Sequence, residues 1–168
     1  MTRRAQGMLV GVLTTAAFVG VFSAPTASAQ EQGARDLDKI PKTVMDVLEA
    51  RFPNAEIRKW TREEEDDLVL YDIEFVQDGR RFEADILDDG RIHNWEREVA
   101  AEDLPPTVTA TVTSRYPRSA LKQIMAVTVV DEGTEALEGY EIVLETADGK
   151  EVEVLVAPDG TILEEGAP

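Results

Sequence analysis

The chain has 168 residues, of which 34 are acidic and 17 basic, and a formal net charge of −17 at pH 7. Nucleic acid and anionic lipid are poor partners for so acidic a protein, and we exclude both. There is no cysteine. Disulfides, thiolate metal sites and cysteine nucleophiles are therefore excluded, and stability must come from a packed core.

Residues 1–29 have the parts of a secretory signal peptide. Arg3 and Arg4 precede an uncharged apolar run over residues 8–22, and Ala27–Ala29 is a small-residue cleavage motif. The apolar run is shorter than the ~20 residues of a membrane span. We expect cleavage, a disordered spacer over residues 30–38, no membrane span in the processed chain, and a secreted or periplasmic location.

An internal similarity follows the spacer. Residues 40–53 align with residues 104–117. Identical pairs are Pro41 and Pro105, Thr43 and Thr107, Val44 and Val108, Arg51 and Arg115, and Pro53 and Pro117. The alignment predicts a tandem repeat, with one copy over residues 39–100 and the other over residues 101–168.

Each aligned stretch is predicted to be a helix, near residues 42–52 and 106–116. In the first, Ile40, Val44, Leu48 and Phe52 share one helical face, and Pro53 ends the helix. In the second, residues 107–113 are rich in β-branched side chains, which favours a strand. The aligned prolines and the retained apolar spacing nevertheless favour a helix.

A strand is expected after each helix. Residues 57–62 alternate, which places Arg58, Trp60 and Arg62 on one face, and residues 121–129 alternate in the same way. Acidic loops are expected next, over residues 63–67 and 131–138.

Two β-hairpins are then predicted. A two-residue turn at Asp78-Gly79 sets Phe75 opposite Phe82, so that apolar residues meet across the strands. The same register sets Ile73 opposite Ala84 and Tyr71 opposite Ile86. A three-residue loop over residues 147–149 sets Leu144 opposite Val152, Ile142 opposite Val154 and Tyr140 opposite Val156.

These elements predict an α+β fold. We expect two tandem helix-plus-antiparallel-strand repeats, with the helices on one face of a shared or continuous antiparallel sheet. Residues 92–99 are the expected fourth strand of the first repeat. About 60 residues bury a marginal core alone, which favours a shared sheet.

The repeated pattern resembles a known family. An Ile/Leu-Pro start, an Arg-Phe/Tyr-Pro end, an alternating hairpin beginning at Tyr71 or Tyr140 and a closing Asp-Gly-x-Ile turn are similar to the PepSY-like domain. They are most similar to its β-lactamase-inhibitor-like variant, which occurs as exported tandem repeats. The resemblance covers residues 40–163 and implies an exported, non-enzymatic module. It assigns no inhibitory residue.

The sequence offers little for catalysis. His93 is the only histidine, and Ser114 and Ser119 lie in no nucleophile motif. We expect a structural His93, no enzymatic activity and no cofactor. The acidic run Glu63–Asp67 could bind Ca²⁺ weakly, but it lacks the spaced ligands of a dedicated loop, and a solvated acidic turn is the simpler interpretation.

The hairpin register gives one sharper inference. Asp72, Glu74, Glu83 and Asp85 share the face away from the apolar residues, with like charges directly opposite, which destabilises a sheet. Arg58 and Arg62, and Lys122 in the second copy, could offset this repulsion. Alternatively, the face receives a basic partner or a cation. Trp60 is either an interface anchor on that face or a covered side chain.

The candidate partner-binding residues are Arg58, Trp60, Arg62, Asp72, Glu74, Glu83 and Asp85. Two functions are left open. The first is a monomeric binding module for an exported protein, as an inhibitor or regulator of a secreted hydrolase such as a peptidase. The second is an acidic Ca²⁺-binding or envelope-associated protein.

Overall fold

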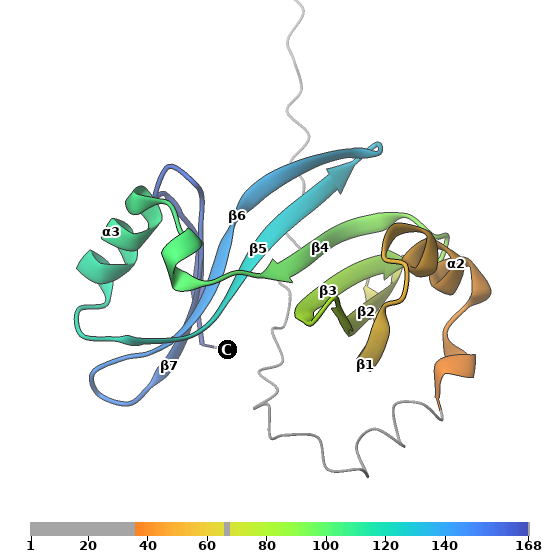
Figure 1. Ribbon diagram of the computed structural model, residues 1–168, viewed down its shortest axis with the longest axis horizontal. Coiled ribbons are helices and arrows are strands. Elements are labelled where there is room, and N and C mark those ends of the chain that lie inside the picture. Colours follow the sequence, from red (N-terminus) through yellow and green to blue (C-terminus); the bar gives the residue numbers. More distant parts are fainter. Residues whose placement is uncertain (1–35, 66–67, 168) are drawn as a thin grey trace, which may run out of the picture.

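A computed structural model describes residues 36–65 and 68–167, and the expected signal peptide lies outside these residues. Eight antiparallel strands form one sheet in chain order (Figure 1). The strands are β1 (Glu56–Glu65), β2 (Leu68–Gln77), β3 (Arg80–Leu87), β4 (Ile92–Glu98), β5 (Ala120–Asp131), β6 (Thr134–Glu145), β7 (Glu151–Val156) and β8 (Ile162–Gly166). Each strand pairs with the next, so the sheet is a continuous meander.

Two α-helices accompany the sheet, α2 (Lys42–Arg51) before β1 and α3 (Pro106–Arg115) between β4 and β5. Short 3₁₀ helices, η1 (Leu37–Lys39) and η2 (Ala101–Asp103), precede them. η1 falls at the end of the expected spacer. Both predicted helices are therefore confirmed, and each lies at a different end of the sheet in Figure 1.

The predicted fold class is wrong. The protein is mostly β, and its two ten-residue helices cover parts of a single sheet. It does not divide into two helix-plus-strand repeats, because β4 pairs with β5 from Asn94–Glu98 to Met125–Val129. Backbone hydrogen bonds thus cross the middle of the sheet without a boundary. The sequence favoured a shared or continuous sheet, but local patterns could not show which strands join its halves, because β4 and β5 lie on either side of α3 in the chain.

Helix α3 forms despite its threonines, because tertiary contacts use them. The Thr107 and Thr111 hydroxyls donate to the carbonyls of Pro158 at 2.6 Å and Gly160 at 2.8 Å. Gly160 has φ +91°, and a Cβ at this position would lie 2.9 Å from Thr111 Oγ1. The turn after β7 can therefore approach the helix this closely only with glycine at position 160. The helix is therefore held against the turn by its own β-branched residues.

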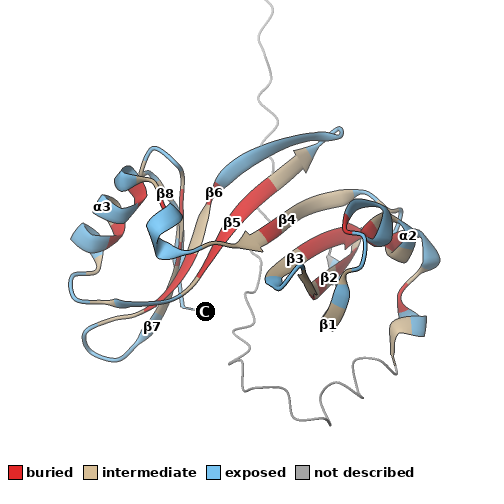
Figure 2. Ribbon diagram, in the orientation of Figure 1, coloured by how far each residue is buried: buried red, intermediate tan, exposed pale blue. Residues whose placement is uncertain are grey.

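Both hydrophobic cores lie on the same face of the sheet. Trp95 packs in the first core and Val99 in the second, and these alternate residues of one chain segment point to the same side. The first core joins Val44, Leu48 and Phe52 to β2 and β3. The second joins Val108 and Val112 to β5, β6 and β7. Figure 2 shows this burial along the middle of the strands and the inner sides of both helices.

Both predicted hairpin registers are confirmed. Phe75 faces Phe82 and Tyr71 faces Ile86 in the first hairpin, while Leu144 faces Val152 in the second. The expected acidic loops are wrong, because Glu63–Glu65 pair with Leu68–Leu70 and Asp131 pairs with Thr134. Charged residues can continue an exposed strand when the partner strand supplies backbone hydrogen bonds. We call the sheet face opposite the helices the open face.

Candidate functional site on the open face of the sheet

Four predicted carboxylates lie together on the open face. Asp72 and Glu74 come from β2, and they stand directly opposite Asp85 and Glu83 of β3. Strand alternation places all four on the side away from Ile73 and the helices. The sequence-based interpretation of these residues is thus confirmed in position, although their binding role stays a prediction.

Strand β4 extends the group in a way that the sequence did not reveal. Glu96 pairs with Glu83 and Asn94 pairs with Asp85. Glu74, Glu83 and Glu96 therefore form a row across three strands, at the ~4.8 Å strand spacing. The alternation of Asn94, Glu96 and Glu98 was a visible signal, but the register of β3 and β4 includes an irregularity between Asp85 and Ile86 that alternation alone cannot locate. We call Asp72, Glu74, Glu83, Asp85 and Glu96 the carboxylate cluster.

Three side chains from β1 and β4 make hydrogen bonds or an ion pair with carboxylates of this cluster. Lys59 Nζ is 2.8 Å from Glu74 Oε1, Thr61 Oγ1 donates to Asp72 Oδ2 at 3.2 Å, and Asn94 Nδ2 donates to Asp85 Oδ2 at 3.0 Å. Among the residues that the structure describes, the buried Oδ1 atoms of Asp72 and Asp85 have no hydrogen-bond partner. The cluster thus contains buried acceptor oxygens that no described donor reaches.

Burial and mutual repulsion change how these groups ionise. Asp85 is 3% exposed and Glu96 is 5% exposed. Burial first, and then Asp72, Asp85 and Glu74, raise the pKa of Glu83 to about 9. Burial and Asp72 raise the pKa of Asp85 to about 7, and burial with Glu141 raises the pKa of Glu96 well above its ordinary range. Glu83 therefore holds its proton near neutral pH, and the carboxyl of Glu96 ionises less readily than a solvated glutamate.

The acidic character continues toward β8. Burial, followed by Glu153 and Glu164, raises the pKa of Glu141 in β6 to about 8. A hollow of about 1350 Å³ begins beside the cluster. Its open-face lining includes Glu96, Val127, Glu141, Glu153, Leu155 and Glu164. The open face therefore combines carboxylates with an apolar floor.

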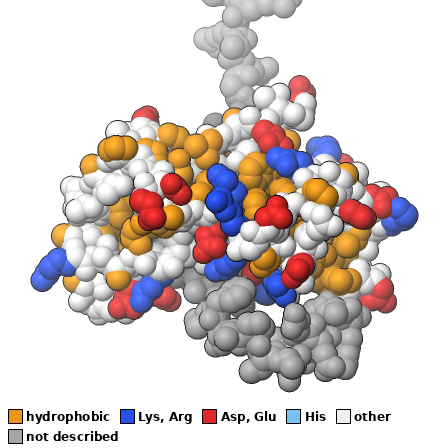
Figure 3. Space-filling model, viewed as in Figure 1, with side chains coloured by type: hydrophobic (Ala, Val, Ile, Leu, Met, Phe, Trp, Pro, Cys, Tyr) orange, Lys and Arg blue, Asp and Glu red, His pale blue; other side chains and the backbone are white. Residues whose placement is uncertain are grey.

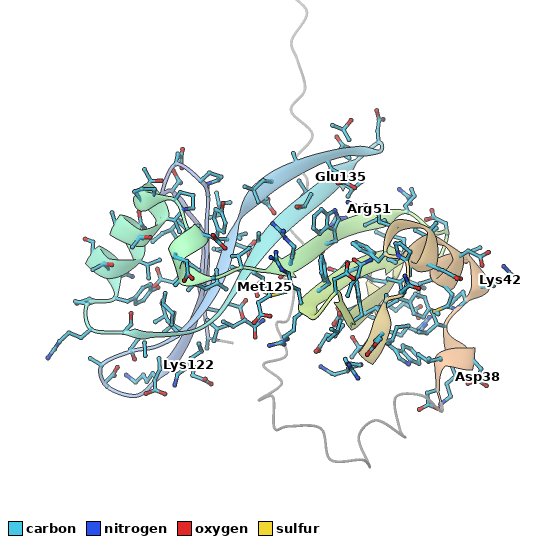
Figure 4. The ribbon with its side chains drawn as sticks, viewed as in Figure 1. Asp38, Lys42, Arg51, Lys122, Met125 and Glu135 are labelled. Atoms are coloured by element: carbon cyan, nitrogen blue, oxygen red, sulfur yellow. The ribbon has the colours of Figure 1, made fainter. Side chains whose placement is uncertain are left out.

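That apolar floor occupies the centre of the open face. Met125, Val127 and Val143 are 2%, 5% and 5% exposed, although they point away from both helices. Met125 lies near the middle of the sheet in Figure 4. Buried apolar groups lower the local dielectric, which strengthens both the repulsion within the cluster and its attraction for a cation.

The expected faces of Trp60 and Arg62 are wrong. A β-bulge between Ile57 and Lys59 shifts the alternation of β1 by one residue. Trp60 instead pairs with Ile73 and packs against the first core, with its ring centre 6.2 Å from that of Tyr71.

The bulge also changes which cation reaches the carboxylates. Arg62 turns to the helix side and pairs with Glu64 at 2.9 Å, while Arg58 pairs with Glu56 at 2.7 Å. Lys59, rather than these arginines, faces Glu74. In the second half, the predicted pairing by Lys122 is confirmed, with Nζ 2.8 Å from Glu145 Oε2.

The other candidate features, a metal site, His93 and a membrane-spanning helix, find little support. Within residues 36–65 and 68–167, no group of three or more His, Asp or Glu side chains is arranged to hold a metal ion. Of the predicted calcium-binding run, residues 66–67 lie outside the described residues. His93 lies in β4 and lines the hollow. None of the described helices is long and apolar enough to cross a membrane.

Comparison with known proteins supports the fold. No family model and no curated protein matches the chain. Among solved structures, a DUF2874 family protein of Bacteroides uniformis has a TM-score of 0.59 at 14% identity, covering 76% of this chain and 88% of that one. A BLIP-like protein of Bacteroides fragilis has a TM-score of 0.54 at 22% identity, covering 76% and 86%.

A third similar structure, from Bacteroides eggerthii, is described provisionally as a periplasmic protein. Its TM-score is 0.60 at 15% identity, covering 76% of this chain and 88% of that one. The chain thus has a BLIP-like fold, as the β-lactamase-inhibitor-like resemblance implied. None of these three descriptions names a PepSY-like domain, a tandem repeat or an enzymatic activity.

Proposed function

We propose that the protein is an exported, non-enzymatic binding module whose open face receives basic side chains of an exported protein partner. A secreted hydrolase, such as a peptidase, fits the partner class, with this protein as its inhibitor or regulator. The observation that carries the proposal is the carboxylate cluster, in which Asp85 and Glu96 are buried beside other carboxylates on a face that no described helix covers.

The physical argument is electrostatic. Carboxylates placed opposite each other destabilise a sheet unless protons or cations neutralise them. In the free protein, Glu83 retains its proton at neutral pH because its pKa is raised to about 9, and the pKa of Glu96 is raised well above its ordinary range. A lysine or arginine from a partner would lower those pKa values and replace the protons. Binding would then strengthen as pH rises and weaken as salt is added.

The test compares capture of secreted proteins by wild type and by the double variant Glu83→Gln/Glu96→Gln. Glutamine resembles the protonated side chain but cannot ionise, so the fold should persist while capture of the basic partner falls about tenfold or more. Glu102→Gln, at an exposed residue of η2, is the matched control. A partner captured equally by all three proteins, at pH 6 and at pH 8.5, contradicts the proposal.

A calcium-binding function is the alternative, and titration separates the two. If Ca²⁺ at sub-millimolar concentration raises the melting temperature of wild type but not of the double variant, the cluster binds a cation rather than a protein. Support for this alternative is weaker, since the described residues include no group arranged for a metal ion.

A further inference from the structure

The β5–β6 hairpin leaves part of one strand unpaired on one side. Residues 134–137 of β6 pair with β5, from Thr134 opposite Asp131 to Leu137 opposite Thr128. Pairing with β7 begins only at Tyr140, opposite Val156. Residues 134–138 are all exposed, Leu137 by 45%, and Figure 2 shows this outer part of β6 as exposed. The described strands therefore leave one edge of residues 134–138 free.

Strand β7 ends next to Gly139, just before it would reach this edge. A Cβ on Gly139 would lie 2.7 Å from the carbonyl oxygen of Val156, so the two backbones are in close contact at the last paired position. Beyond it the chain turns, with the Ala157 amide donating to the Thr161 carbonyl at 2.8 Å, and continues into β8. The free edge is thus a consequence of where the β7–β8 turn begins.

The outer edges of the sheet are protected in ways that natural sheets commonly use. Strand β1 carries the bulge between Ile57 and Lys59 with basic side chains beside it, and β8 has only five residues. Residues 134–137 pair with β5 without interruption, a bulge at Glu138 ends this run before Gly139, and Leu137 is exposed. The backbone groups along the side of this segment that β7 does not reach are a template for an added strand.

The charges around the free edge indicate what kind of strand could pair with it. The hollow that the free edge borders is lined by Glu138, Glu141, Glu153 and Glu164. A second copy of this chain would bring its own Glu138 and the acidic lining of its own hollow against these carboxylates, which like-charge repulsion disfavours. An extended peptide with basic residues at alternate positions would satisfy both the backbone edge and the carboxylates, because alternate side chains of an added strand point to the same face.

We propose that residues 134–138 of β6 accept an extended, lysine- or arginine-bearing segment of the partner as an added strand. This inference rests on the proposed function and specifies how the partner is held. The main-chain hydrogen bonds of the added strand would supply affinity, and its alternate basic side chains would supply specificity through the hollow.

The test uses synthetic peptides and the full protein. The probe is a short peptide in which lysine alternates with valine. Two further versions carry N-methyl groups on either the lysine amides or the valine amides. Only one set of amides can face β6 in an added strand, so one version should lose about tenfold or more in affinity while the other binds like the probe. Hydrogen exchange should slow within residues 134–138 when the probe is bound.

Other outcomes overturn the inference. Equal binding of both methylated versions, or no binding of the unmethylated probe, contradicts strand addition. Equal binding of a peptide with glutamate in place of lysine contradicts the basic occupant. The double variant Glu83→Gln/Glu96→Gln distinguishes failure of strand addition from failure of the proposed function. If the peptides do not bind as an added strand but the double variant still loses capture of the secreted partner, strand addition is wrong and the carboxylate cluster is supported.

Discussion

At the scale of single residues, the open face is defined by carboxylates that the protein keeps close together. Asp72, Glu74, Glu83 and Asp85 could be placed from sequence because alternation and the Asp78-Gly79 turn fix the register of β2 and β3. The position of Trp60 could not be predicted from sequence. The extra residue of the β-bulge in β1 exchanges the two faces of the strand, and the pattern of alternation does not show where the bulge lies.

The raised pKa values predict that stability falls as pH increases. The folded protein keeps protons on Glu83, Asp85 and Glu141, whose pKa values are about 9, about 7 and about 8. The unfolded chain releases them near its ordinary carboxyl pKa of about 4. This contribution is fully present below about pH 4 and is lost as pH rises toward 9. Chemical denaturation across this range should therefore show a decreasing free energy of unfolding.

Glu83→Gln should flatten that dependence. Glutamine cannot ionise, so the variant should match wild type near pH 5 and exceed its free energy of unfolding at pH 9 by roughly 1–3 kcal/mol. Glu102→Gln, in η2, should follow wild type. A Glu83→Gln protein that loses stability with pH as steeply as wild type would show that Glu83 does not hold the proton.

Trp60→Ala should cost stability, because Trp60 packs against the first core and Tyr71. The side chain is only partly buried, so we expect a loss of roughly 2–3 kcal/mol, below the range for a fully buried tryptophan. Arg58→Ala is the control on the same strand and should change the free energy of unfolding by less than about 0.5 kcal/mol. An unchanged melting temperature for Trp60→Ala would mean that the ring contributes no packing.

At the scale of elements, both helices were predictable because prolines and apolar spacing outweigh the β-branched composition of residues 106–115. The expected acidic loops were wrong, because a run of charged residues disfavours burial but is compatible with an exposed strand. The long β5–β6 hairpin that results reaches back over the first half of the molecule. Arg51 of α2 and Glu135 of β6 point toward each other there (Figure 4).

The contact between α2 and β6 can be measured by a double-mutant cycle. Arg51 makes two hydrogen bonds to Glu135, at 3.0 and 3.1 Å, and its guanidinium lies 5.0 Å from the Trp95 ring centre. Both side chains are over a third exposed, so we expect a coupling of only about 0.5–1 kcal/mol between Arg51→Ala and Glu135→Ala. The exposed pair Lys42 and Asp46 is the control, with about 0.3–0.5 kcal/mol. A coupling for Arg51 and Glu135 below that control would show that the hairpin is not tied to α2.

At the scale of the whole molecule, the sequence predicted the elements more accurately than their assembly. Short helices and regular hairpins follow from local patterns, whereas the pairing of β4 with β5 joins residues separated by α3. Because that pairing unites all strands, the sheet offers one extended open face. Figure 3 shows acidic and basic side chains distributed among hydrophobic ones on the face it presents. The carboxylate cluster, by contrast, is concentrated in β2, β3 and β4.

The most direct test of the carboxylate cluster is an NMR titration of its side-chain carboxyl carbons and that of Glu141. We expect Glu83 and Glu141 to titrate near pH 9 and pH 8, Asp85 to titrate near pH 7, and Glu96 to have a pKa well above its ordinary range. If all four carboxyls instead titrate between about pH 3 and pH 5, as solvated groups do, the open face stores no protons and the proposed binding site loses its physical basis.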